Sequence, residues 1–516
     1  MVSRLTGERS VNRDENWERY ATIYGFMRRR GVPSDILLGY VAPAILKRET
    51  IVRSALLNRT RHLLLERDEA RGTQLLGELA RLLREHRRDA ANSSAMVLSK
   101  DLVTTLLESL ENERRMRFSA EIIGHVVKMG DDYDLRLIVD NGVIFDRLCN
   151  SLKLSDDDAF NAGASISAMA ELAARSRRLC TMVLKQGGLG LTLRRLDIEL
   201  KKDKFQRSQS LLRKGALTVA TFCRRKPNYQ LFLRPALPTL RKLLLETTTS
   251  EDDVMTDCYY LETHMRTASY VCEAFSALCD GQDDHVQDVL HLEGVLKRII
   301  DLLSHSASIV ALPSLTACGN ACAGADRFVD ILLEENILGK LNILLTRLNP
   351  EIRKGACWVL SNILSGTTAQ VQAVLDYGFD FSQVLNDQDP EVKQEAACAL
   401  SNAIVAGAPA QIAAFVHIGA VGPLCDLLNV NSMPLVTNTL EALNGLLNAL
   451  VASPTPALLY KLALDISSRG LHHLERLADH PRSDVSDLAR NSLATFAAMT
   501  TLASVLLIQQ SEDRLL

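Results

Sequence analysis

A short turn-and-helix unit recurs along this 516-residue chain at nearly constant spacing. Each copy starts with a small turn residue, followed by an aliphatic residue and a Leu-rich segment, as in EGVLKRIIDLL and ENILGKLNILL. Glycine and asparagine tolerate positive φ, so we expect the chain to turn sharply between helices at these positions. The turn residues are Gly142, Gly187, Gly294, Asn336, Gly378, Gly419 and Gly470. Their spacings are 45, 42, 42, 41 and 51 residues, and the stretch between Gly187 and Gly294 is longer.

Each unit ends in a second, longer helical pattern, as in PEIRKGACWVLSNILSG and PEVKQEAACALSNAIVAG. Pro350 and Pro390 stand where the first helical turn tolerates proline, and Gly324, Gly366 and Gly407 are predicted to mark helix ends. A period near 42 residues is typical of armadillo and HEAT repeats. One unit cannot cover its own apolar faces, so neighbouring units must stack. The sequence therefore predicts an all-α fold, a right-handed α-α superhelix of the armadillo-repeat solenoid type.

The repeat pattern covers only part of the chain. Residues 101–500 are predicted to form the array, with about eight to ten repeats, and residues 501–516 a C-terminal tail. Residues 1–100 show helical patches without a clear period, and we interpret them as an N-terminal helical extension. The polar run ETTTSEDDVMTD (246–257) is interpreted as a solvated insertion between two helices.

Composition restricts the class of partner and the compartment. The chain has 59 Lys and Arg against 62 Asp and Glu, so it lacks the positive excess that direct nucleic-acid binding requires. Its 11 cysteines form no C-x-x-C pair and are interpreted as reduced core residues. The first residues lack the apolar stretch of a secretory signal, and the apolar run 403–424 is interrupted by two prolines and three glycines. We expect a soluble protein of the cytoplasm and nucleus.

Possible catalytic, cofactor and metal motifs are weak. KQGGLGL lacks the strand and the Lys-Ser/Thr pair that phosphate binding needs, and it coincides with a repeat turn. The pair His472 and His473 and the stretch 280–285 do not form a closed ligand set at metal-site spacing. Cys318 and Cys322 lie one turn apart in an apolar helix, which favours inert packing. We therefore expect no enzymatic activity, no cofactor and no metal.

A strip of polar residues follows the repeat period on the side away from the core. In GACWVLSNIL, the helical phase places the aliphatic residues on one side, and Trp358 and Asn362 well away from them. The same phase pairs Thr316 with Asn320 and Cys398 with Asn402, and the three amides are spaced by 42 and 40 residues. Amides repeated in this way can hydrogen-bond an extended peptide, and an indole can hold a Lys or Arg side chain. Alternatively, Trp358 packs under a neighbouring loop or at a repeat junction.

The segments GACWVLSNILSG, QEAACALSNAIVAG and GAVGPLCDLL resemble the C-terminal armadillo repeats of importin-α, the adaptor for nuclear localisation signals. The resemblance extends roughly from residue 120 to residue 496. It implies an adaptor that binds basic extended segments, and a smaller, C-terminal signal pocket in which Glu395 provides a carboxylate for a basic side chain. The residues that it assigns to this pocket are Asn320, Trp358, Ser361, Asn362, Glu395, Cys398 and Asn402.

The larger, N-terminal pocket of the family is degenerate in this chain. The Trp/Asn pairs that the resemblance leads us to expect are replaced by Ile122/Val126, Ser167/Glu171 and Leu217/Thr221. An outward-facing Ile122/Val126 pair would expose apolar surface, so we expect the N-terminal extension or an apolar partner segment to cover it.

The family also carries an N-terminal basic segment that binds importin-β. Two basic spots here are candidates for that contact, although a solvated helix face is the alternative; they consist of Arg28, Arg29, Arg30, Lys47 and Arg48. The function predicted from the sequence is an importin-α-like adaptor for nuclear protein import. The alternatives are an armadillo scaffold without a transport role and an assembly chaperone.

Overall fold

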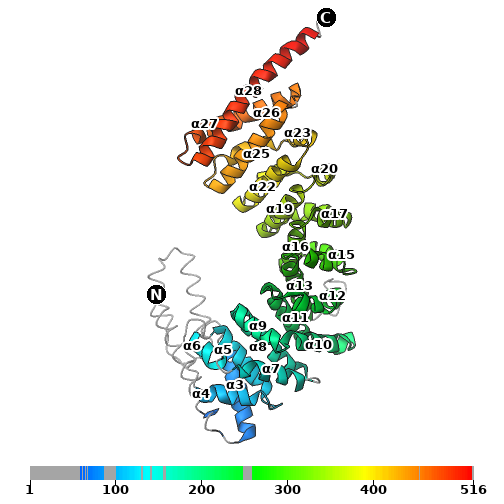
Figure 1. Ribbon diagram of the computed structural model, residues 1–516, viewed down its shortest axis with the longest axis vertical. Helices are drawn as coiled ribbons and strands as arrows, with labels where there is room; N and C mark the ends of the chain where they lie inside the picture. The colour runs from blue at the N-terminus through cyan, green and yellow to red at the C-terminus, as the bar shows by residue number, and fades with distance from the viewer. Residues whose placement is uncertain are drawn as a thin grey trace, which may run out of the picture. The chain divides into compact units, whose positions relative to one another are not determined.

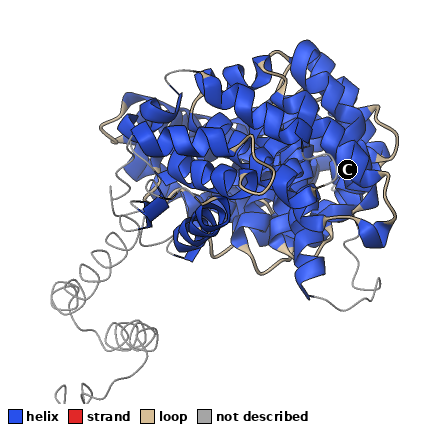
Figure 2. Ribbon diagram, turned by 90° about the horizontal axis from the view of Figure 1, so that it is seen from below, coloured by secondary structure: helices blue, strands red, loops and turns tan. Residues whose placement is uncertain are grey.

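The computed structural model describes residues 59–60, 62–63, 66, 68–85, 100–129, 132–139, 142–154, 158–247, 258–452 and 454–513. Within these ranges the secondary structure is helical and contains no strand (Figure 2). The basic spots at 28–30 and 47–48 and most of the predicted insertion, residues 248–257, lie outside the described residues.

Two compact units make up the chain, Met1–Leu191 and Thr192–Leu516. The helices of the first unit are α3 (Glu69–Glu85), α4 (Lys100–Ser109), α5 (Met116–Met129), α6 (Asp132–Val139), α7 (Val143–Leu154), α8 (Ala159–Arg175) and α9 (Arg177–Lys185). The boundary falls within α10 (Gly188–Leu200).

The second unit contains most of the array. Its helices up to the middle of the unit are η3 (Lys204–Gln206), α11 (Gln209–Arg224), η4 (Tyr229–Leu233), η5 (Arg234–Ala236), α12 (Leu237–Glu246), α13 (Cys258–Cys279), α14 (Asp283–Leu290), α15 (Val295–Leu303), α16 (Ser308–Cys322), α17 (Asp326–Glu334) and α18 (Ile337–Leu345). The remainder are α19 (Pro350–Leu364), α20 (Thr368–Tyr377), α21 (Phe381–Leu385), α22 (Pro390–Ala406), α23 (Pro409–His417), α24 (Val421–Leu427), α25 (Met433–Ala452), α26 (Pro456–Asp465), η6 (Ile466–Gly470), α27 (Leu471–Ala478) and α28 (Ser483–Asp513).

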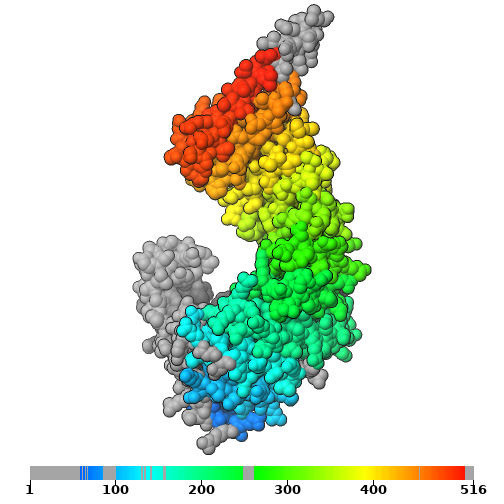
Figure 3. Space-filling model, viewed as in Figure 1, coloured from blue at the N-terminus to red at the C-terminus, as the bar shows by residue number. Residues whose placement is uncertain are grey.

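From α14 onward, two short helices alternate with one long helix in each repeat. The long helices α11, α13, α16, α19, α22, α25 and α28 pack in this order, each against the next (Figure 1). In Figure 3 the same repeats, coloured from green to red, form one continuous stack. The predicted all-α solenoid is confirmed.

The backbone at the repeat turns follows the sequence prediction at six of the seven positions. Gly142, Gly187, Gly294, Gly378 and Gly419 have φ between 66° and 82°, and Asn336 has φ 58°. Gly470 differs, with φ −107°. There α26 continues through the π-helical turn η6 into α27, so no left-handed residue is needed. Gly470 is instead in close contact, since a Cβ on it would lie 2.7 Å from Sγ of Cys425.

The predicted helix starts are also confirmed, and the helix ends lie at the predicted stop glycines or two residues before them. Pro350 and Pro390 occupy the first turns of α19 and α22, and the preceding residues, Asn349 and Asp389, accept hydrogen bonds from the backbone of those turns. An asparagine or aspartate at this position satisfies N–H groups that have no partner within the helix. Gly407 is the C-cap of α22, whereas α16 and α19 end two residues before the predicted stop glycines. The last helix, α28, continues through residue 501 to Asp513.

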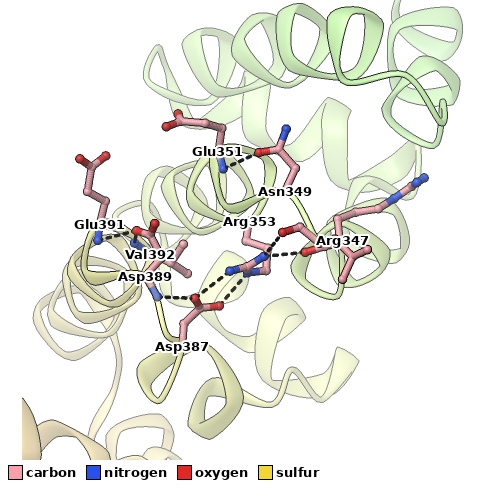
Figure 4. Close-up of polar contacts among 9 residues, drawn as sticks. Arg347, Asn349, Glu351, Arg353, Asp387, Asp389, Glu391 and Val392 are labelled. Carbon is pink, nitrogen blue, oxygen red and sulfur yellow. Dashed lines mark hydrogen bonds and ion pairs between the residues drawn. The ribbon is translucent and has the colours of Figure 1, made fainter. Parts of the chain in front are cut away.

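Arg353 connects two neighbouring repeats (Figure 4). Its guanidinium donates to the backbone oxygens of Arg347 and Leu348 at 2.7 and 2.8 Å, just after α18. It also pairs with both carboxylate oxygens of Asp387, at 2.7 and 2.8 Å, in the loop after α21. Asp387 in turn accepts from the backbone N–H of Asp389, the N-cap of α22. One arginine therefore links a helix C-terminus to the start of the next repeat's long helix.

Within the described ranges, no single helix has the length and apolarity to cross a bilayer. The pair α23 and α24 meets both criteria together, but the two helices are bent by 81°. Among the cysteines whose side chains are described, Cys398 is half-buried and the others are buried, as predicted for core residues. Burial raises the pKa of Cys318 and Cys322, so both thiols stay protonated.

Candidate functional site

The residues predicted to form a strip lie on three successive long helices of the second unit. Asn320 is on α16, Trp358 and Asn362 on α19, and Cys398 and Asn402 on α22. The three asparagines and the tryptophan are half-buried. They therefore belong to neither the closed core nor the fully exposed surface.

The three asparagines form a ladder that spans neighbouring repeats. Nδ2 of Asn320 donates to the backbone oxygen of Ser276 at 2.9 Å, and Nδ2 of Asn362 donates to that of Gly319 at 3.0 Å. Nδ2 of Asn402 donates to the backbone oxygen of Ser361 at 3.1 Å. Each amide thus bonds to the long helix of the preceding repeat. The orientation of all three side chains is set within the protein, and Oδ1 of each amide accepts no hydrogen bond from the described residues.

Two predicted pocket residues, Ser361 and Cys398, form hydrogen bonds with neighbouring repeats. Ser361 is buried, and its hydroxyl accepts a hydrogen bond from Nδ2 of Asn402 at 2.9 Å. The expectation that Ser361 lines the pocket is therefore wrong, because the side chain holds the neighbouring rung instead. Cys398 accepts from Nδ2 of Asn438 on α25 at 2.7 Å, which engages its sulfur with the next repeat.

The indole of Trp358 lies on the backbone of α16. A Cβ added to Gly319 would lie 2.1 Å from Cζ3 of the indole and 2.5 Å from Cη2, so the ring fills the space that a side chain would take. The alternative of packing at a repeat junction is thus realised on one side of the ring. Trp358 remains half-buried and also lines an open hollow. Trp358 therefore packs against the neighbouring repeat and remains partly accessible to solvent.

The hollow beside Trp358 has a volume of about 210 Å³ and is lined by both apolar and charged side chains. Its lining residues are Leu312, Leu315, Thr316, Glu351, Lys354, Gly355, Trp358 and Glu395. Nζ of Lys354 lies 3.0 Å from Glu351 and 2.8 Å from Glu391. Glu395, in contrast, forms no ion pair with any residue in the described part of the chain.

The Glu395 carboxyl is half-buried, and its pKa is shifted. Burial raises the pKa above the ordinary value of 4.5, the charge of Lys354 lowers it, and that of Glu391 raises it. Burial dominates because a carboxylate loses hydration there without gaining a close cation. An incoming ammonium or guanidinium would provide that cation.

Sequence reasoning did not identify Gly319, Lys354 and Glu391. A signal for Gly319 existed, since the residues before the three asparagines, Gly319, Ser361 and Ser401, are all small. A small residue there leaves room for the next repeat's side chains to reach the backbone. No comparable signal existed for Lys354 and Glu391, because lysine and glutamate at the start of a helix are normally solvated.

The predicted exposed pair in the first unit is wrong. Ile122 and Val126 are 0% and 3% exposed. In that unit Lys128, two residues after Val126, reaches the surface of α5 and pairs with Glu171 of α8 at 3.0 Å. Two residues along a helix turn a side chain through more than half a revolution, from core to surface. The expected cover over an apolar Ile122/Val126 surface loses its basis.

The remaining residues of the degenerate pocket lie in different environments. Ser167 and Glu171 on α8 are half-buried, and Leu217 on α11 is half-buried as well. Thr221 is buried and donates from its hydroxyl to the backbone oxygen of Leu217 at 2.8 Å.

Comparison with known proteins places the chain. No family model matches it. Importin subunit alpha-4 of Arabidopsis thaliana is 32% identical over 298 residues, which cover 56% of this chain and 52% of the relative. Importin subunit alpha-1a of Oryza sativa subsp. japonica is 30% identical over 288 residues, and the match covers 49% of it. The chain thus spans about half the length of these two relatives.

One relative matches over a longer stretch, and one solved structure shares the fold. The crystal structure of an engineered protein shares the fold, with a TM-score of 0.67 and 19% identity over 86% of this chain and 98% of that one. Importin subunit alpha-2 of Arabidopsis thaliana is 31% identical over 412 residues, covering 78% of this chain and 72% of the relative. With its helical repeats and this extended match, the chain belongs to the importin-α family.

Proposed function

We propose that this chain is an adaptor that binds an extended basic segment of a cargo protein along α16, α19 and α22, for import into the nucleus. The observation that carries the proposal is the hollow beside Trp358. It combines an indole, held on the backbone of Gly319, with the Glu395 carboxylate, which has no ion pair among the described residues. A Lys or Arg side chain satisfies both, because its stem packs on the indole and its charge pairs with the carboxylate.

The asparagine ladder supports the same proposal. Asn320, Asn362 and Asn402 each donate from Nδ2 within the protein, and each retains Oδ1 as an acceptor. An extended peptide presents backbone N–H groups at a regular spacing, which such acceptors can satisfy without reading side chains. Because internal hydrogen bonds already orient the amides, less conformational entropy is lost on binding.

The affinity for a lysine-containing peptide is expected to depend on pH through Glu395. Burial raises the pKa of this carboxyl in the free protein, and a bound ammonium lowers it in the complex. Binding therefore releases a proton between these two pKa values. The affinity should rise with pH through this range and level off above the raised pKa of the free protein. Calorimetric titration at a series of pH values measures the effect.

Matched substitutions identify the group responsible. Glu395→Gln should weaken binding near neutral pH by about fivefold, as one screened charge pair is lost, and should flatten the pH dependence. Glu335→Gln, at an exposed glutamate outside the hollow, should leave both unchanged. A Glu395→Gln variant with the wild-type pH profile would remove Glu395 from the binding site.

The transport role has a separate test. If the basic spots at 28–30 and 47–48 contact importin-β, the full chain should retain importin-β in a pull-down, and a chain lacking residues 1–70 should not. Peptide binding by the second unit should survive that truncation, because the strip lies on α16 to α22. Peptide binding without any importin-β binding would instead favour a scaffold or chaperone.

A further inference from the structure

Lys354 lines the hollow and already pairs with two carboxylates, one of which, Glu351, also lines it. It follows Glu351 by three residues on α19, and its ammonium bridges Glu351 and Glu391 of the next repeat, at 3.0 and 2.8 Å. Hydrogen bonds to Glu391 and Glu351 raise the pKa of Lys354, so it stays charged over the physiological range. The protein's own ammonium group therefore lies beside carboxylates with which a basic ligand could otherwise pair.

The surrounding charges divide into two parts. Glu351 and Glu391 have side chains that are 60% and 65% exposed and share the Lys354 ammonium, so their charge is partly compensated in solvent. Glu395 is half-buried and lacks an ion pair among the described residues. A first basic side chain pairs with Glu395. A second basic side chain on the same side of the bound segment would lie next to the Lys354 ammonium, and the two positive charges would repel each other.

We propose that Lys354 is a specificity-determining residue that restricts the hollow to a single basic side chain of the bound segment. This inference rests on the proposed peptide-binding function and adds the class of sequence that the site prefers. The segment carries one Lys or Arg at the hollow, with an uncharged residue at the next position that faces the same side. Side chains of an extended chain alternate between two sides, so that next position is two residues away.

Three peptides in an alanine-glycine background test the proposal. One carries a single lysine, the second carries another lysine two residues away, and the third carries the other lysine one residue away. The last two have the same charge and composition, so general electrostatic attraction cancels between them. Wild-type protein should bind the peptide with lysines two residues apart about fivefold more weakly than its isomer, because the second ammonium lies on the side of Lys354. The Lys354→Met variant should bind the peptide with lysines two residues apart about fivefold more tightly than its isomer, because Glu351 and Glu391 become available.

A second variant controls for the loss of one positive charge. Lys340 on α18 lies 3.6 Å from Asp301 and does not line the hollow, so Lys340→Met should bind the two isomers as wild type does. If Lys354→Met discriminated between the two isomers as wild type does, while wild type bound the single-lysine peptide tightly, the role of Lys354 would be overturned and the proposed function would stand. Failure of wild type and Lys354→Met to bind any of the three peptides would overturn the proposed function itself.

Discussion

Replacement of Arg353 by methionine is expected to lower the free energy of unfolding of the second unit by about 3 kcal/mol. The guanidinium donates to two backbone oxygens after α18 and to both carboxylate oxygens of Asp387. The Arg353 and Asp387 side chains are only 15% and 11% exposed. Methionine retains the stem but leaves the carboxylate poorly solvated and without its cation, which costs more than the loss of a surface pair. Guanidinium denaturation followed by circular dichroism measures the change.

Two comparisons identify the origin of that loss. Arg482 forms a similar pair with Asp484, but both side chains are about half exposed, so Arg482→Met should change stability far less than Arg353→Met. The Arg353 hydrogen bonds hold the pKa of Asp387 below its ordinary value of 3.8. The stabilisation by this pair is therefore present above that ordinary value, and it is lost as the pH falls through the lowered pKa of the folded state. Equal effects of Arg353→Met and Arg482→Met would contradict the role of Arg353 as a link between repeats.

Substitution of Gly319 by alanine is expected to weaken the binding of a lysine-containing peptide by about tenfold, close to the effect of Trp358→Ala. The added Cβ would lie 2.1 Å from Cζ3 of the indole, a distance that a rigid ring can relieve only by moving. Alanine stabilises a helix relative to glycine by about 1 kcal/mol, so helix propensity predicts a more stable α16. A loss of peptide affinity therefore cannot be attributed to a weakened helix. Fluorescence anisotropy of a labelled peptide measures the affinity.

The control for Gly319→Ala is a glycine with open space around it. Gly190 in α10 has no atom within 4 Å of an added Cβ, so Gly190→Ala should leave peptide binding unchanged. The double variant of Gly319→Ala with Trp358→Ala should bind no more weakly than Trp358→Ala alone, because alanine at 358 removes the ring that clashes. Additive losses in the double variant would show that Gly319 acts through something other than the indole.

The turns and caps of the repeats could be predicted because they depend on local chemistry. Gly294, Asn336 and Gly378 adopt positive φ as expected, and Pro350 starts α19. Glycine, asparagine and proline restrict or permit backbone angles wherever they occur. Gly470 does not follow this rule, because the chain stays helical there from η6 into α27 and needs no left-handed residue.

Side-chain assignments on the helix faces succeeded only where the register was certain. The spacing of Asn320, Asn362 and Asn402 placed all three on one strip, which the hydrogen bonds between repeats confirm. In α5, Ile122 and Val126 were predicted to face outward, whereas both are buried. A helix with apolar residues on most sides gives little phase information, so its contacts must be known before its faces can be assigned.

The amino-acid sequence by itself determined the all-α repeat architecture, the positions of most turns and the period of the asparagine ladder, because each depends on residue type and spacing along the chain. Only the tertiary structure placed the indole of Trp358 on Gly319, buried Ser361, and left Glu395 without an ion pair among the described residues while Lys354 bridges Glu351 and Glu391. These features depend on which atoms of adjacent repeats meet, and a spacing of about 42 residues does not specify contacts at the scale of a few ångströms.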